Sequence, residues 1–261
     1  MNCKKMNQKE KREYMIRFLL DESLEYRNTP VPKNQEEQQR LLRSLMNIRS
    51  PIPADNNFLK IQDEYLQEEL KSKGITHIDD LIPTSENIYL WQGDITTLKV
   101  DAIVNAANAQ MLGCFVPCHA CIDNAIHTFA GIQLRLACNE LMERQGESEK
   151  TGTAKITKAF NLPSNYVLHT VGPIIRGRLT QKDCDLFASC YRSCLELAEE
   201  NEIRSIAFCC ISTGEFHFPN KKAAEIAVRT VTQFIAERQS KVKVIFNVFK
   251  DEDYKIYKRL L

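Results

Sequence analysis

Short apolar runs rich in β-branched residues alternate with longer helical patterns from about residue 87 onward, and this alternation constrains the fold more than any other feature. Such an order is typical of a largely parallel, buried sheet covered by helices on both faces. Ligand sites in such α/β folds lie at the carboxyl ends of the strands. The expected strands are Ile88 to Trp91, Ala102 to Asn105, Tyr166 to Val171, Ser205 to Ile211 and Val242 to Phe249, and the expected helices are Ile122 to Arg144, Lys182 to Asn201, Lys221 to Glu237 and a short one from Asp251 to the C-terminus.

The preceding segment has a helical pattern. A first helix ends before Pro30, Asn34 stands three residues before Glu37 in a capping arrangement, and a third helical pattern stops at Gly74. We therefore expect an N-terminal helical extension over residues 1–85 and an α/β domain over residues 86–261. The charged faces of the extension are most simply solvated, and a partner-docking surface is the alternative.

The charge balance excludes several classes of partner. The chain has 35 basic and 34 acidic side chains, so it lacks the positive field that drives non-specific binding to nucleic acids or anionic membranes. Its charged N-terminus has no apolar signal-peptide core, which leads us to expect a cytoplasmic protein. The uncharged stretch from Ala102 to Ile122 has the length of a membrane span, but its amides, proline and histidine argue against one.

Ten cysteines are unusual for a cytoplasmic chain of 261 residues. In a reducing compartment they are expected to be core residues or metal ligands rather than disulfides. Cys114, Cys118, His119 and Cys121 fall within eight residues, and their soft donors indicate zinc. Two arrangements remain open: an open three-ligand site, and a Cys118–Cys121 pair resembling a zinc knuckle or redox dithiol. Inert buried thiols are a third possibility, and packing is the expected role of Cys138, Cys184, Cys190, Cys194, Cys209 and Cys210.

Three further polar stretches follow expected strands. Asp94 can accept hydrogen bonds from an exocyclic amine or cap the next turn. Asn105 and Asn108 supply neutral groups suited to a sugar, or bond to their own backbone in a turn. The stretch from Ser212 to Asn220 precedes a helix and can expose backbone N–H groups to a phosphate, although a capped loop is the simpler interpretation.

Several of these stretches together resemble the macrodomain family over roughly residues 86 to 261. The resemblance implies a three-layer α/β/α sandwich with a mixed central sheet, and it implies ADP-ribose as the ligand. The motifs that carry it are Gly93 to Thr96, Asp101 to Asn108, Thr153 to Thr157, Tyr166 to Pro173 and Ile211 to Gly214.

One loop departs from the common pattern. Most macrodomains have a glycine-rich loop after the Asn-Ala-Ala-Asn motif, whereas here residues 113–123 contain the cysteines and histidine. This loop is similar to that of the zinc-dependent subfamily of microbial protein-ADP-ribose hydrolases, which also carries a helical N-terminal extension. The resemblance implies one zinc ion held by Cys114, His119 and Cys121, with Cys118 at a variable position.

The resemblance also implies roles for other residues. Asp94 and Ile95 would contact the adenine end of ADP-ribose, and Asn108 would contact and orient the distal ribose. Asp123 matches an acidic position that assists catalysis in metal-free relatives, a role that a metal would put in question. The residues expected at the diphosphate and distal ribose are Ser212, Thr213, Gly214, Glu215 and Phe216.

The implied activity is zinc-dependent removal of mono-ADP-ribose from carboxylate-linked protein side chains, which reverses a sirtuin-type ADP-ribosyltransferase. The implied substrate is a lipoylated carrier related to the glycine-cleavage H protein. An ADP-ribose reader without turnover and an interaction domain with a structural metal are the alternatives. An open coordination position favours the enzyme, because a catalytic zinc keeps one site free.

Overall fold

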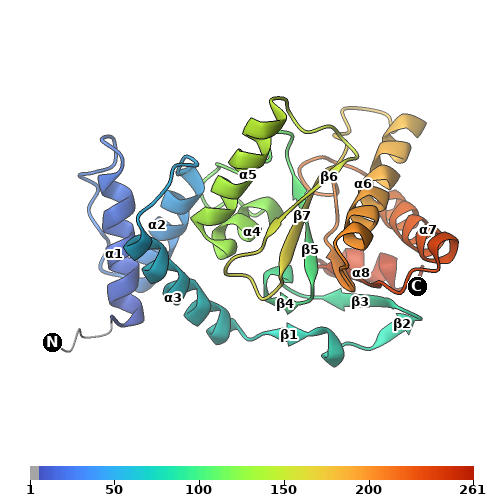
Figure 1. Ribbon diagram of the computed structural model, residues 1–261, viewed down its shortest axis with the longest axis horizontal. Coiled ribbons are helices and arrows are strands. Elements are labelled where there is room, and N and C mark those ends of the chain that lie inside the picture. Colours follow the sequence, from blue (N-terminus) through green and yellow to red (C-terminus); the bar gives the residue numbers. More distant parts are fainter. Residues whose placement is uncertain (1–5) are drawn as a thin grey trace.

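The computed structural model describes residues 6–261, and its first three elements are helices that precede every strand (Figure 1). They are α1 (Gln8–Asp21), α2 (Gln35–Ile48) and α3 (Asn56–Lys73). The Asn34 side chain accepts hydrogen bonds from the backbone N–H groups of Glu36 and Glu37, which confirms the predicted start of α2.

The extension has a core of its own, because each of its helices turns an apolar side inward. The side chain of Ile132 from the following domain joins this core, so the extension packs directly on the domain. The buried residues of the three helices are Met15, Ile16, Leu19, Leu20, Leu42, Leu45, Met46, Phe58, Ile61, Tyr65 and Leu66.

The main sheet has seven strands within the described residues, in the order β2-β3-β9-β8-β5-β7-β6. The two short strands β1 (Thr76–His77) and β4 (Leu98–Lys99) pair separately. The strands of the main sheet are β2 (Pro83–Ser85), β3 (Ile88–Gln92), β5 (Ala102–Ala107), β6 (Ala154–Lys158), β7 (Tyr166–Val171), β8 (Ser205–Phe208) and β9 (Lys243–Val248).

The five central strands are parallel and both edge strands are antiparallel, so the sheet is mixed. Edge strands β2 and β6 were not predicted from the apolar pattern, because their side chains are largely exposed or only half-buried. Two expected strands are also shorter than predicted: β8 ends at Phe208 rather than Ile211, and β9 ends at Val248, which leaves Phe249 outside the sheet.

Helices lie on both faces of the sheet: α4 (Ile122–Ala130) and α5 (Ile132–Gln145) on one side, and α6 (Gln181–Glu200), α7 (Asn220–Arg238) and α8 (Asp251–Tyr257) on the other (Figure 1). The single helix expected from 122 to 144 is wrong. Gly131 breaks it with a backbone φ of 93°, where a Cβ atom would lie 2.7 Å from the Gln62 amide nitrogen.

The predicted packing role of the remaining cysteines fits the structure. Cys184 and Cys209 are buried, Cys210 is partly buried, and Cys138, Cys190 and Cys194 are wholly inaccessible, while Cys3 lies outside the described residues. No helix among residues 6–261 has the length and apolar character needed to cross a bilayer.

Candidate functional site

The polar stretches identified in the sequence follow β3, β5 and β8, whose carboxyl ends share one edge of the sheet because these strands and β9 are parallel. The cysteine-rich loop connects β5 to α4 at the same edge. The fold therefore places the predicted metal loop beside the predicted ligand loops.

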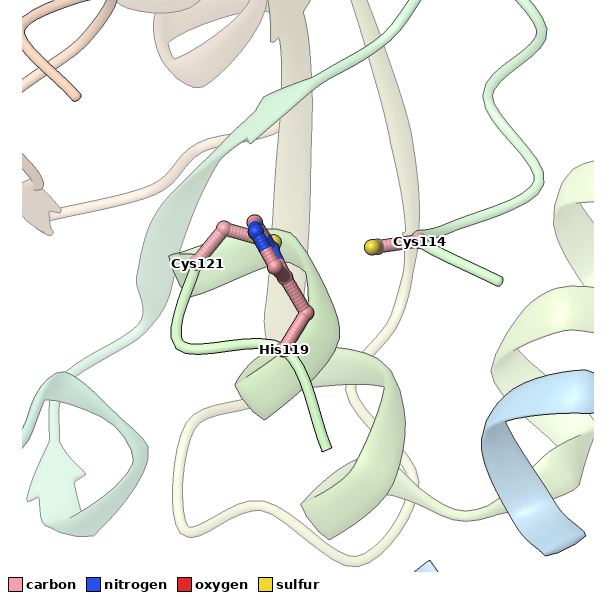
Figure 2. A group of neighbouring side chains, drawn as sticks. All are labelled: Cys114, His119 and Cys121. Carbon is pink, nitrogen blue, oxygen red and sulfur yellow. The ribbon is translucent and has the colours of Figure 1, made fainter. Parts of the chain in front are cut away.

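Three soft donors converge in this loop. The ligand atoms of Cys114, His119 and Cys121 all lie within 4.8 Å of one another. Figure 2 shows their side chains pointing toward a common centre, with Cys114 on the segment that follows β5 and the other two just before α4. Gly113 allows the turn into this segment, because a Cβ atom there would lie 2.7 Å from the His127 ring.

The donor set fits a zinc ion. Two thiols and an imidazole are ligands that zinc prefers, and three protein ligands leave one position open. The Nδ1 atom of His119 is buried and has no hydrogen-bond partner within residues 6–261. Burial also raises the pKa of the Cys121 thiol to about 12, although the Asn124 backbone N–H opposes this shift. A bound cation would supply the partner that Nδ1 lacks and would favour the thiolate.

Cys118 points elsewhere. Its Sγ lies 3.2 Å from the Ser44 hydroxyl on α2, and it is not part of the converging group. Its backbone has a φ of 52°, a left-handed conformation that reverses the chain between the Cys114 and His119 positions. The geometry therefore favours the open three-residue group over the Cys118–Cys121 pair.

The two asparagines of β5 and its loop have different environments. Asn105 is fully buried and donates a hydrogen bond of 2.8 Å to Asp123 Oδ1. Asn108 is half-buried; its Nδ2 donates to the Gly113 carbonyl at 3.1 Å and lies 3.4 Å from Asp123 Oδ2. Its Oδ1 accepts from the Gln110 N–H, as the turn interpretation expects. Asn108 is thus at the site surface, and Asn105 is part of its support.

Asp123 lies beneath these amides and is 5% exposed. Burial raises the pKa of its carboxyl to about 6, while the Asn105 hydrogen bond and the Arg135 charge act in the opposite direction. Its environment suits a group that orients Asn108 from below. Glu215, by contrast, has an exposed carboxylate that lies 3.6 Å from His119 Nε2.

Asp94 caps the short 3₁₀ helix formed by Ile95–Thr97. Its Oδ1 accepts hydrogen bonds from the Thr96 N–H at 3.0 Å and from the Thr96 hydroxyl at 2.6 Å, so the capping interpretation is correct. Its Oδ2 lies 3.4 Å from Lys73 Nζ and remains partly exposed. Ile95 is 1% exposed as a whole residue, so neither its side chain nor its backbone presents accessible surface to a ligand in this conformation.

The loop after β8 closes on itself. Ser212 has a φ of 59°, its carbonyl accepts from the Phe218 N–H at 2.9 Å, and its hydroxyl is buried without a partner among the described residues. Gly172 permits this approach, because a Cβ atom there would lie 2.0 Å from Ser212 Oγ.

The rest of this loop is more open. Thr213 is half-buried, Gly214 and Glu215 are exposed, and the Phe216 carbonyl accepts a hydrogen bond from the Ile175 N–H. Such a loop can present backbone N–H groups to an anion.

Sequence reasoning did not single out three residues that lie near the candidate site. Phe249 follows β9 directly and is 75% exposed, and the Gly93 N–H bonds to the carbonyl of the preceding Val248, so the Phe249 backbone lies near the turn that contains Asp94. An exposed aromatic residue immediately after a buried strand was the available signal. Arg43 and Asn47 of α2 also contact the cysteine-rich loop, and nothing in the local pattern indicated this.

Comparison with known proteins relates this arrangement to a family. Residues 104–227 match the Macro domain model. The chain is 57% identical to a protein-ADP-ribose hydrolase of Treponema medium, covering 98% of this chain and 100% of that protein. It is 49% identical to one from Staphylococcus aureus, covering 94% and 93%. The crystal structure of a Trypanosoma brucei macrodomain in complex with ADP-ribose matches with a TM-score of 0.65, at 31% identity over 83% of this chain and 94% of that one.

Proposed function

The chain belongs to the macrodomain family, among its protein-ADP-ribose hydrolases, and from this premise we propose that it removes mono-ADP-ribose from carboxylate side chains with the help of one zinc ion. The observation that carries the zinc proposal is the convergence of Cys114, His119 and Cys121 within 4.8 Å, beside the loops proposed to bind the ligand. When bound there, zinc would supply Lewis-acid chemistry toward a ribose oxygen or lower the pKa of a water molecule toward about 7.

The ligand would lie along the carboxyl edge of the sheet. Phe249 and Asp94 flank the place for the adenine end, and the loop from Ser212 to Phe216 would bind the diphosphate through its backbone N–H groups. The near-neutral chain needs no basic patch for this. Asn108 would orient the distal ribose next to the metal loop, and Asp123 would hold the Asn108 amide.

The reaction adds water across the bond between the anomeric carbon and the acceptor side chain. Water attacks the anomeric carbon, the carbon–oxygen bond to the carboxyl group breaks, and the products are free ADP-ribose, a side-chain carboxylate and a proton. Glu215 would exchange this proton: its carboxylate is 67% exposed and lies 3.6 Å from His119 Nε2, which supports this role. Asp123 is too enclosed to exchange protons with solvent as readily.

The resemblance to the zinc-dependent subfamily supports a cytoplasmic role opposite a sirtuin-type ADP-ribosyltransferase, with a lipoylated carrier related to the glycine-cleavage H protein as the modified protein. A carrier of this kind would present its ADP-ribose at the open end of the site, next to Asn108 and the exposed Glu215.

The alternative is a reader that binds ADP-ribose without turnover. The experiment that separates the two incubates the full chain with a protein mono-ADP-ribosylated on aspartate or glutamate and follows free ADP-ribose over time. We expect stoichiometric release of ADP-ribose at catalytic enzyme concentrations. Binding of free ADP-ribose without any release from the protein would leave only the reader.

A further inference from the structure

We propose that Arg43 and Asn47, on helix α2 of the N-terminal extension, are positioning residues. They hold the cysteine-rich loop between β5 and α4 in the conformation that brings the proposed zinc ligands together. The proposal rests on the zinc site of the proposed function. It gives the extension a role at the site, because α2 lies against α4 and the loop before it (Figure 1). The two residues reach the segment between the Cys114 and Cys121 ligands from outside the macrodomain fold.

Arg43 binds two acceptors at once. Its Nη2 donates to the backbone carbonyl of His119 at 3.0 Å and to Asn124 Oδ1 at 2.7 Å, and its Nε also donates to Asn124 Oδ1 at 3.2 Å. The guanidinium therefore fixes the main chain of one proposed ligand directly. Its planar fork is suited to such a double contact, and a lysine could not reproduce it.

Arg43 also acts through Asn124, which is fully buried. The Asn124 side chain donates to the Val116 carbonyl at 3.0 Å, and its backbone N–H points to Cys121 Sγ at 3.4 Å. One arginine thus restrains a carbonyl in the middle of the loop, the carbonyl of His119 and the residue whose N–H faces the Cys121 sulfur.

Asn47 fixes the bend of the loop. Its Oδ1 accepts from the Cys118 N–H at 2.9 Å, and Cys118 has the left-handed φ of 52° that few non-glycine residues adopt. Its Nδ2 donates to Thr128 Oγ1 at 2.9 Å, which ties the bend to α4. Because Asn47 is 1% exposed, no water replaces this hydrogen bond without a rearrangement.

The same helix is also tied to the other end of the loop. Arg135 of α5 donates to the carbonyls of Met46 and Arg49 at the end of α2. The same side chain donates to the Leu112 carbonyl at 2.7 Å and stacks on Phe115, 4.2 Å from its ring centre. Both ends of the segment that carries the ligands are therefore braced against α2.

These contacts matter for metal binding because the ligands lie on an irregular loop. Restraining its main chain before the metal arrives removes part of the ordering cost of binding. Outer partners of metal ligands typically contribute about 10–100-fold to metal affinity. The N-terminal extension would thereby have a function at the site, the positioning of the cysteine-rich loop, which its sequence pattern did not predict.

The test titrates the full-length metal-free protein with Co²⁺ and follows the visible absorption of thiolate-bound Co²⁺. We expect Arg43→Met to weaken Co²⁺ binding about 10–100-fold, and Asn47→Ser to weaken it in the same direction. Arg43→Lys should recover part of the loss, because one hydrogen bond can re-form. Arg40→Met is the matched control, one turn earlier on α2, with an exposed side chain that makes no hydrogen bond or ion pair with the described residues.

The possible outcomes distinguish a failure of the positioning role from a failure of the proposed zinc site. Wild-type Co²⁺ affinity in folded Arg43→Met and Asn47→Ser proteins would overturn the positioning role and leave the zinc site intact. Absence of the thiolate absorption in the wild-type protein would overturn both. Thermal unfolding of the metal-free proteins checks the fold, and if Arg43→Met does not fold, unchanged affinity in Arg43→Lys contradicts the proposal.

Discussion

The Nε2 atom of His119 lies 3.6 Å from Glu215 Oε1, which joins the metal-ligand loop to the loop after β8. The two residues are far apart in the sequence and come together because β5 and β8 are parallel neighbours in the sheet. This contact places the most exposed carboxylate of the site at the junction of the proposed metal and phosphate subsites.

Glu215→Gln tests the role of this carboxylate. The glutamine keeps the size of the side chain and removes its ability to exchange a proton. We expect kcat to fall about 10²-fold or more, with KM nearly unchanged. Steady-state hydrolysis of a mono-ADP-ribosylated protein gives both constants, and zinc content measured on the same sample should remain that of the wild type. An unchanged kcat would remove Glu215 from proton transfer.

Asn108 and Asp123 should act as one unit. Asp123→Asn places an amide where Asn108 Nδ2 meets a carboxylate oxygen at 3.4 Å, so Asn108 loses its orientation. We expect Asn108→Ala to lower kcat/KM about 10²-fold and Asp123→Asn to lower it about 10-fold, with the double variant no worse than Asn108→Ala alone. Fully additive losses in this double-mutant cycle would show that Asp123 acts independently of Asn108.

Phe249 is expected to stack on the adenine. Because Phe249 is 75% exposed, truncation costs the fold little, whereas loss of base stacking should cost about 1–3 kcal/mol of binding free energy. Isothermal titration of Phe249→Ala with ADP-ribose should therefore show affinity about 5–150-fold lower. Leu24→Ala, which alters an 84% exposed side chain of the extension, is the control and should bind as the wild type does. Equal affinities in the two variants would place the adenine elsewhere.

His169 should make stability depend on pH. It is fully buried, its Nε2 lies 2.8 Å from Thr157 Oγ1, and burial lowers its pKa from the usual 6.5 to about 3. Below pH 6.5 the unfolded chain binds a proton that the folded chain does not, so stability falls as pH decreases toward 3. Each pH unit well below 6.5 should cost about 1.4 kcal/mol.

Urea unfolding between pH 7 and pH 5 measures this effect. Because His169→Gln removes the titrating group, its free energy of unfolding should fall less steeply with decreasing pH than that of the wild type, whatever its absolute value. Parallel curves for the two proteins would mean that His169 is protonated in the folded state as easily as in the unfolded one.

The sequence was most informative where burial repeats at regular spacing. The central strands β5 and β7 were predicted closely because their side chains are buried on both faces, and β3 was predicted closely although only its first two residues are buried. The same rule failed for β6, an edge strand in which Thr157 is buried, Lys158 is exposed and the first three residues are half-buried. It also failed at Gly131, where a close approach to Gln62 ends one helix and starts another within an otherwise continuous pattern.

The site was predictable only where local sequence contains its chemistry. The clustering of Cys114, His119 and Cys121 is visible in eight residues, but their choice over Cys118 came from family resemblance. In the structure Cys118 contacts Ser44 and does not join the converging group. The Arg43 contact spans 76 positions. The spacing of apolar residues along the sequence does not indicate such a contact, because it depends on how the N-terminal extension packs against the α/β domain.

The central claim is that one zinc ion on Cys114, His119 and Cys121 is required for hydrolysis. The most direct measurement removes metal from the full chain with a chelator, determines zinc content and the rate of ADP-ribose release, and repeats both after zinc is restored. In the wild type and in Cys118→Ser we expect one zinc per chain, loss of activity when the zinc is removed and recovery when it is restored. We do not expect this behaviour in Cys121→Ser, which lacks one of the proposed ligands. Full activity in a wild-type protein shown to contain no metal would contradict the account.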